Sequence, residues 1–187
     1  MGLPLPTLSF DAFLAWENEQ VERHEFHRGE VFLMVGARRV HARVVMNLAR
    51  ALGNALAGTP CQVFSESAKV SPADDTLLYP DVFVTCDPAD LRTDMIFRAP
   101  KLVVEVLSKS TQAHDRSAKF ALYRRMPSLA EYGLVDPDTR RVEVFRIGRD
   151  GLWVLHDMSD TDALLLASVD VRISMKALFD GVEPAAV

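Results

Sequence analysis

Two carboxylates occur where the sequence predicts buried β-strands. Asp81 opens the apolar stretch PDVFVT, and Glu105 lies in the middle of KLVVEVLS. An ionised carboxylate among apolar side chains is costly unless a cationic partner, a proton or a metal ion compensates for the lost hydration. If the two strands are neighbours in one sheet, both carboxylates could bind a hard divalent cation such as Mg²⁺ or Mn²⁺, which prefers oxygen ligands. The alternative is a structural ion pair between Glu105 and an arginine or lysine.

The strand around Glu105 is predicted to be covered on both faces. Side chains alternate along a strand, so Glu105 shares one face with Val103 and Leu107. The opposite face is apolar throughout and consists of Leu102, Val104 and Val106. A nearly continuous apolar strand is typical of a sheet that is packed on both sides.

The periodicity of apolar residues predicts the elements that position these carboxylates. We expect helices over 8–19, 41–58 and 110–126, strands over 61–70, 79–87, 101–108 and 130–136, hairpins over 23–36 and 140–158, and a final strand and helical turn over 170–181. The order of helix, three strands, helix and strand indicates an α/β fold with a mixed sheet. A length of 187 residues fits one domain over residues 1–187.

The composition is that of a soluble globular protein. Hydrophobic residues make up 49% and charged residues 25% of the chain, which argues against a disordered or a membrane protein. The sequence has no apolar run of membrane-spanning length and no signal-peptide pattern at its start, so a cytoplasmic location is expected. Cys61 and Cys86 are too few for a zinc-ligand pattern, and in the cytoplasm we expect them to be buried free thiols.

The basic residues are unevenly distributed. A net charge of −5 argues against indiscriminate nucleic-acid binding, but segments 35–57 and 98–125 together carry +9, which leaves −14 for the rest of the chain. If both segments face the same side, they would form a local basic surface suited to phosphates. The alternative is that each segment is a solvated face without a shared function.

Four stretches in order resemble a known family. PDVFV, KLVVEVLS, DRSAKFALY and EYGLVDP, with their spacing, are similar to the Uma-type family of restriction-endonuclease-like proteins, within the PD-(D/E)xK nuclease superfamily. The resemblance runs from about Arg23 to Phe179. It implies a restriction-endonuclease-like α/β core, in which helices flank a mixed central sheet, here with added β-hairpins.

The resemblance also implies a catalytic set. Asp81 and Glu105 would be the metal ligands, and a lysine would assist the attacking water. The lysine that is usual two residues after the glutamate is replaced by Leu107. Some families with this core supply the lysine from the following helix, and Lys119 is the matching candidate.

The helix that carries Lys119 has further residues on the same stripe. Asp115, Lys119 and Tyr123 follow one another at spacings of four, so they lie on one side of the predicted helix and could face the metal site. The alternative for Lys119 is a surface ion pair with Asp115, which would contribute little to stability.

Two residues near the start of the chain match recurring positions of the family. Glu25 and His41 could complete the metal site or hold waters around it. By chemistry alone, Glu25 is more often a solvated strand residue and His41 a satisfied core histidine. Four arginines are expected to hold the nucleic-acid backbone: Arg43, Arg50, Arg124 and Arg125.

Together these features predict a metal-dependent endonuclease that hydrolyses phosphodiester bonds of nucleic acid, with DNA as the expected substrate. The alternative is a catalytically silent nuclease fold that serves as a nucleic-acid-binding or assembly module, because a fold does not decide function. The hairpin over 140–158 could pair with a second copy to make a homodimer. It could equally fold onto its own sheet in a monomer.

Overall fold

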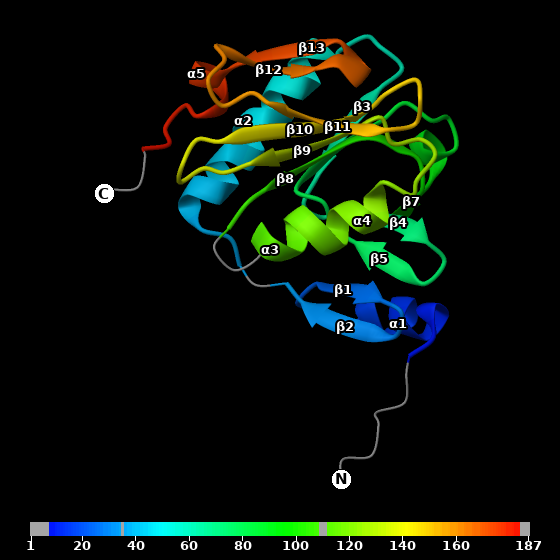
Figure 1. Cartoon of the computed structure of the whole chain (residues 1–187). Coiled ribbons are helices and arrows are strands. Elements are labelled where there is room, and N and C mark those ends of the chain that lie inside the picture. The colour runs from blue at the N-terminus through cyan, green and yellow to red at the C-terminus, as the bar shows by residue number, and fades with distance from the viewer. Residues whose placement is uncertain (1–7, 35, 109–111, 184–187) are drawn as a thin grey trace.

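The computed structural model describes residues 8–34, 36–108 and 112–183 (Figure 1). The helices are α1 (Phe10–Glu17), α2 (Arg39–Ala55), α3 (Gln112–His114), α4 (Phe120–Tyr123) and α5 (Met175–Leu178), with a π-helical turn over Asp115–Lys119 and 3-10 turns over Asp90–Arg92 and Ala167–Val169. The strands are β1 (His24–His27), β2 (Glu30–Leu33), β3 (Gln62–Ser65), β4 (Lys69–Ala73), β5 (Thr76–Leu78), β6 (Val82–Thr85), β7 (Ile96–Phe97), β8 (Pro100–Val106), β9 (Glu131–Val135), β10 (Val142–Ile147), β11 (Trp153–Asp157), β12 (Ala163–Leu166) and β13 (Val171–Ser174).

Two mixed sheets form the framework, where the sequence predicted one. The first has six strands in the order β11-β10-β9-β8-β6-β3, with β8 and β9 parallel. The second has five strands in the order β2-β1-β5-β4-β7, with β4 and β7 parallel. The expected strand over 61–70 is divided between them, because the backbone at Glu66 has a positive φ of 46° and ends the run at β3.

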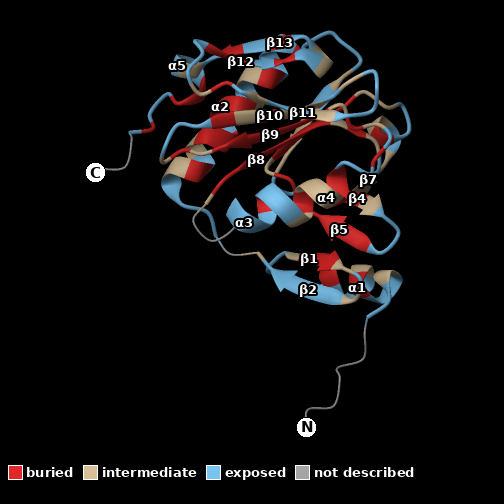
Figure 2. Cartoon of the chain, in the orientation of Figure 1, coloured by how far each residue is buried: buried red, intermediate tan, exposed pale blue. Residues whose placement is uncertain are grey.

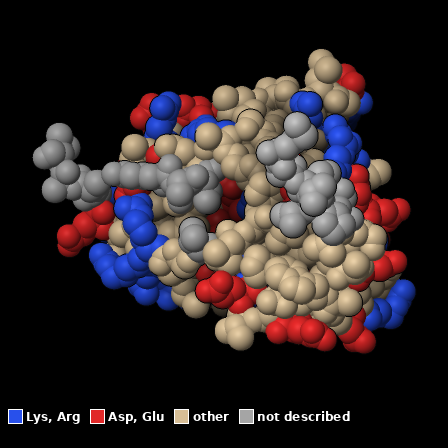
Figure 3. Space-filling model, turned by 90° about the horizontal axis from the view of Figure 1, so that it is seen from below, with Lys and Arg blue, Asp and Glu red and all other residues tan. Residues whose placement is uncertain are grey.

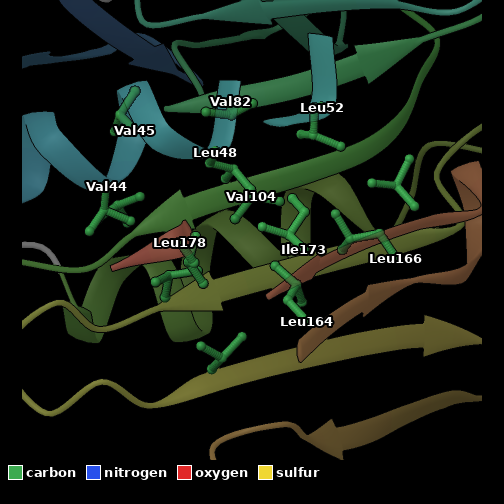
Figure 4. Packing of buried hydrophobic residues seen from close by; sticks show 14 of the residues in the cluster. Val44, Val45, Leu48, Leu52, Val82, Val104, Leu164, Leu166, Ile173 and Leu178 are labelled. Carbon is green, nitrogen blue, oxygen red and sulfur yellow. The ribbon is translucent and has the colours of Figure 1, made fainter. Parts of the chain in front are cut away.

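The six-stranded sheet is packed on both faces, as the nearly continuous apolar strand around Glu105 predicted. Leu48 and Leu52 of α2 pack with Val104 of β8 on one face, where β12 and β13 complete the cluster (Figure 4). On the other face, Tyr123 of α4 packs with Val103. Figure 2 shows the resulting band of buried strand residues between α2 and α4.

Local sequence features account for several element boundaries. Ser9 caps α1, since its Oγ accepts a hydrogen bond from the backbone N–H of Ala12 at 3.2 Å. The β1–β2 hairpin turns at Arg28 and Gly29, whose φ values of 49° and 89° suit a two-residue turn of type I′. Asn47 of α2, by contrast, is a polar residue that is buried.

The burial of Asn47 has a specific cause. Its amide donates hydrogen bonds to the carbonyl oxygens of Leu178 and Asp180, at 3.1 and 2.9 Å, and so ties α2 to the segment that follows α5. This contact joins residues more than 130 positions apart, so the helical periodicity of α2 alone could not show it.

The β10–β11 hairpin folds onto its own sheet. β10 pairs with β9 over five residues, and β11 forms the edge of the six-stranded sheet. Leu152, Val154 and Leu155 are exposed there. Pairing of this edge with a second copy stays a prediction.

Within the described residues, no helix is long and apolar enough to cross a membrane.

The expectation of two free thiols was wrong, because Cys61 and Cys86 form a disulfide. β3 and β6 are antiparallel with Gln62 opposite Thr85, so the next pair along the two strands brings the cysteines face to face, with Cα atoms 4.0 Å apart. A separation of 25 residues concealed this pairing from the sequence.

The disulfide generates a stability prediction. Closing a loop of this length should stabilise the fold by about 3 kcal/mol, chiefly by restricting the unfolded chain. Chemical denaturation should therefore show that a reducing agent lowers the free energy of unfolding of the parent protein. The Cys61→Ala, Cys86→Ala double variant is the control, because its stability should not respond to the reductant. A parent protein that is equally insensitive would contradict this prediction.

Candidate active site

Asp81 and Glu105 meet as neighbours across the six-stranded sheet. β6 and β8 are antiparallel with Val82 opposite Val104, so Asp81, which directly precedes β6, lies beside Glu105. The backbone N–H of Asp81 donates a hydrogen bond to Glu105 Oε2 at 3.2 Å, and that of Val106 donates to Asp81 Oδ2 at 2.7 Å. The condition set by the sequence, that the two strands be neighbours in one sheet, is therefore met.

Lys119 brings an ammonium group to the same place. Its Nζ lies 2.9 Å from Glu25 Oε1, 3.4 Å from Glu105 Oε1 and 3.6 Å from Asp115 Oδ1. Only 7% of Lys119 is exposed. The alternative of a surface pair with Asp115 is therefore wrong, since the pair is buried and shares its cation with two further carboxylates.

The local backbone explains how a helical lysine reaches a strand carboxylate. Asp115 and Lys119 begin and end the π-helical turn between α3 and α4, an irregularity that often marks functional sites. The hydroxyl of Tyr132 in β9 donates to the carbonyl oxygen of Asp115 at 2.9 Å, which fixes this turn to the sheet. Leu107, at the usual lysine position, is buried in the cluster beneath α4.

Glu25 holds the lysine from the five-stranded sheet. It is 7% exposed, so it is not the solvated strand residue that chemistry alone favoured. Its Oε1 also accepts a hydrogen bond from the backbone N–H of Tyr79 at 3.1 Å. The Tyr79 hydroxyl in turn donates to Glu17 Oε1 at 2.9 Å, at the end of α1.

The roles of Glu17 and Tyr79 were missed by the sequence reasoning. The two contacts that link them to the site, Tyr79 to Glu25 and Tyr79 to Glu17, each join residues more than 50 positions apart. Neither residue has a local signal beyond the position of Tyr79 next to the Pro-Asp pair. A contact between the end of a helix and a tyrosine so far along the chain depends on the tertiary fold.

His41 contacts the site from the first turn of α2. Its Nε2–H donates to Asp81 Oδ2 at 3.2 Å, while its Nδ1 is buried without a hydrogen-bond partner among the described residues. Burial lowers the pKa of His41, but the hydrogen bond to Asp81 and the charge of that carboxylate outweigh it, so the pKa is raised. His41 is thus a partner of a candidate ligand as well as a buried residue.

Tyr123 completes the predicted stripe beneath the carboxylates. It is fully buried, and its hydroxyl has no hydrogen-bond partner within the described part of the chain. Burial raises the pKa of Tyr123, and the nearby charge of Glu105 raises it further. The phenol therefore stays neutral close to the candidate site.

The carboxylates outnumber the cations. Burial raises the pKa of Glu105 well above its usual range, with Lys119 opposing and Asp81, Asp115 and Glu25 adding to the effect. Burial lowers the pKa of Lys119, but the charges of Glu105 and Glu25 raise it by more, so its ammonium persists. A site with this balance favours the uptake of a proton or of another cation.

The cluster lies in an open cleft of about 780 Å³. Its walls come from the β1–β2 hairpin, the start of α2 and the π-helical turn. Figure 3 looks onto the molecule from below and shows acidic side chains in a recess near the centre, with separate groups of Lys and Arg and further acidic groups around the periphery.

The structure favours the alternative to a shared basic surface, because α2 and α4 pack on opposite faces of the sheet. Arg43 forms an ion pair with Asp180 at 2.9 Å. Arg50 donates to Asn47 Oδ1 at 3.5 Å, also on α2.

The two arginines that follow α4 differ from each other in their position relative to the cleft. The guanidinium of Arg124 lies over the ring of Phe120, 5.8 Å from its centroid. Arg125 instead lines a smaller hollow that shares Glu25 with the cleft. Of the four predicted backbone-binding arginines, Arg125 is thus the one that the structure places beside the candidate site.

Comparison with known proteins agrees with the resemblance in the sequence. Residues 10–176 match the Uma2 family, which is described as "Putative restriction endonuclease". Two uncharacterized proteins from Synechocystis sp. are similar along most of their length. The first is 34% identical over 95% of this chain and 94% of its own, and the second is 31% identical over 81% and 87%.

A crystal structure of a "putative nuclease belonging to DUF820" from Anabaena variabilis is similar in fold. The TM-score is 0.79, and the match covers 94% of this chain and 99% of that one at 16% sequence identity. At this identity the likeness shows the fold alone. Because the family match spans most of the sequence, the chain belongs to the Uma2 family of restriction-endonuclease-like proteins.

Proposed function

We propose that the protein is a metal-dependent endonuclease that hydrolyses phosphodiester bonds of nucleic acid. The observation that carries this proposal is the meeting of Asp81 and Glu105 with the buried ammonium of Lys119 in an open cleft. Membership of a family described as "Putative restriction endonuclease" supports nucleic acid as the substrate class.

The donor set fits Mg²⁺ or Mn²⁺. Asp81 and Glu105 offer carboxylate oxygens from adjacent strands, and Asp81 Oδ1 accepts no hydrogen bond from the described residues. Within the same ranges no group of three or more His, Cys, Asp and Glu side chains is arranged to hold a metal ion. A site with only these two carboxylate ligands suits a cation that takes one or two carboxylates from the protein and completes its coordination shell with water and phosphate oxygens.

Each remaining residue has a distinct task in this proposal. A bound divalent ion supplies a Lewis acid that polarises the phosphate and acidifies water. Lys119 orients the attacking water or stabilises the negative charge that develops on the phosphate. Glu25 holds the ammonium in place at 2.9 Å, and His41 holds the Asp81 carboxylate at 3.2 Å.

The raised pKa of Glu105 predicts how stability depends on pH without metal. The folded protein retains the Glu105 proton at pH values where the unfolded chain has released it, so the folded state binds more protons. This contribution is therefore greatest at low pH, and it is lost as the pH rises above 4.5, the ordinary value for this carboxyl group, and through the raised value. Glu105→Gln should remove this loss, because glutamine is neutral at every pH and of similar volume.

The measurement is denaturant unfolding of both proteins over a pH series, with the exposed Glu19→Gln as the matched control that should follow the parent. In calorimetric titration with Mn²⁺, Glu105→Gln should also lose most of the heat of binding. If Glu105→Gln and the parent lose stability in parallel with rising pH and bind Mn²⁺ alike, Glu105 is neither the protonated group nor a ligand.

Lys119→Met separates catalysis from metal binding. Methionine keeps much of the bulk of the lysine stem and removes the charge. We expect Mn²⁺ affinity close to that of the parent and cleavage of nucleic acid at least about a hundredfold slower, the lower range for the loss of one electrostatic stabiliser. Removing one partner from a buried ion cluster can cost about 3–5 kcal/mol of stability, so rates are compared at a temperature where circular dichroism shows both proteins folded.

The matched control is Lys176→Met, on α5 and remote from the cleft. Its cleavage rate should equal that of the parent. Cleavage by Lys119→Met at the parent rate would refute the role of the relocated lysine. Failure of the parent itself to cleave any single-stranded, duplex or structured DNA or RNA with metal would favour the alternative of a binding or assembly module.

A further inference from the structure

The strand β2 forms an apolar wall of the cleft. All four of its residues are exposed, and it is the edge strand of the five-stranded sheet. Phe32 and Leu33, 42% and 52% exposed, line the cleft together with Met34. Edge strands are usually protected by charges or covered, so an apolar edge that faces a candidate active site indicates a binding surface.

The position of Phe32 is tied to the catalytic cluster. Phe32 pairs directly with Glu25 across the β1–β2 hairpin, and residues paired in this way project from the same face of a sheet. The Phe32 ring lies 6.2 Å from the ring of His114, centroid to centroid, and His114 immediately precedes Asp115 of the π-helical turn. Two exposed rings therefore line the same cleft as the carboxylates and Lys119.

The charges of the cleft are poorly suited to an intact duplex. Binding to duplex nucleic acid depends on several lysines and arginines that contact phosphates. Among the described lining residues, Arg23 donates to the carbonyl oxygen of Glu66 at 3.4 Å, and Arg38 is paired with Asp138 at 2.6 Å. Lys119 is buried among carboxylates. The acidic residues that line the same cleft are Glu22, Glu25, Glu66, Asp81, Glu105 and Asp115.

The smaller hollow next to the cleft is lined by a further cationic side chain, that of Arg125. This space of about 200 Å³ is lined by Phe32, His114, Leu78 and the exposed Arg125. No described carboxylate lies within ion-pair distance of Arg125. Its guanidinium could bind one phosphate on the far side of the two rings.

We propose that the site acts on unpaired nucleotides. Phe32 and His114 stack an unpaired base, Arg125 binds a neighbouring phosphate, and the scissile phosphate lies at Asp81 and Glu105. The proposal rests on the nuclease function proposed above and names its substrate class, single-stranded or locally unpaired nucleic acid. Stacking on aromatic side chains supports such binding with few cations, because every base presents a face to the ring.

The test measures binding and cleavage separately. Fluorescence anisotropy without divalent metal compares labelled single strands of DNA and RNA with duplexes of the same sequences. We expect the parent protein to prefer the single strands in at least one of the two arms. Phe32→Ala should weaken single-strand binding by about tenfold, as expected for the loss of one stacking platform, whereas Phe32→Trp should retain it.

The matched control is Leu165→Ala, which removes a comparably exposed apolar side chain from β12, away from the cleft. Its affinity should equal that of the parent. If Phe32→Ala does not fold, His114→Ala provides the second test. An abasic site placed in the single strand should then weaken binding to the parent but not to the variant.

The outcomes distinguish this inference from the proposed function. Cleavage of duplexes in preference to single strands, or equal affinity of Phe32→Ala and the parent, would overturn the inference and leave the nuclease function intact. Phe32-dependent binding of single strands without any metal-dependent cleavage would support the inference and contradict the hydrolysis.

Discussion

The ammonium of Lys119 is shared by buried carboxylates from three separate parts of the chain. Glu25 comes from the hairpin of the five-stranded sheet, Glu105 from the centre of the six-stranded sheet and Asp115 from the helical segment that covers it. Taken alone, each carboxylate would be costly to bury, and so would the lysine. Together they offset much of that cost. Because these groups must stay in contact, they hold the two sheets in a fixed relative position at the cleft.

This constraint also explains why so much of the surrounding structure consists of supports. The backbone N–H of Tyr79 holds Glu25, and its hydroxyl is held in turn by Glu17 at the end of α1. Asp81 is fixed by the N–H of Val106 and by His41. These hydrogen bonds keep the carboxylates close together although they repel one another. The excess of negative charge in the cluster therefore favours the binding of a cation.

The sequence predicted the parts of the site that depend on local rules. Alternation along β8 placed Glu105 on the same face as Val103 and Leu107, which the structure shows to be the face toward α4, and the spacing of four residues placed Lys119 beside Asp115. A long apolar strand and a helical stripe can each be recognised from a short stretch of neighbouring residues in the sequence. The sequence left the pairing of β6 with β8 as a condition, and the structure meets it, as strands that follow one another along the chain often do.

The parts that sequence reasoning missed depend on distant contacts. The disulfide between Cys61 and Cys86 requires the register of β3 on β6, and the burial of Asn47 requires a carbonyl more than 130 residues away. The shared basic surface failed for the same reason, since charge in the sequence does not specify which face of the sheet a helix covers.

The most direct test of the central claim is a crystal structure of the parent protein grown with Mn²⁺, with anomalous diffraction recorded to locate the ion. The account predicts an anomalous peak in contact with Asp81 and Glu105, with the Lys119 ammonium still bound to Glu25. A peak at another place in the protein, or none at Mn²⁺ concentrations that give binding heat in calorimetry, would contradict it.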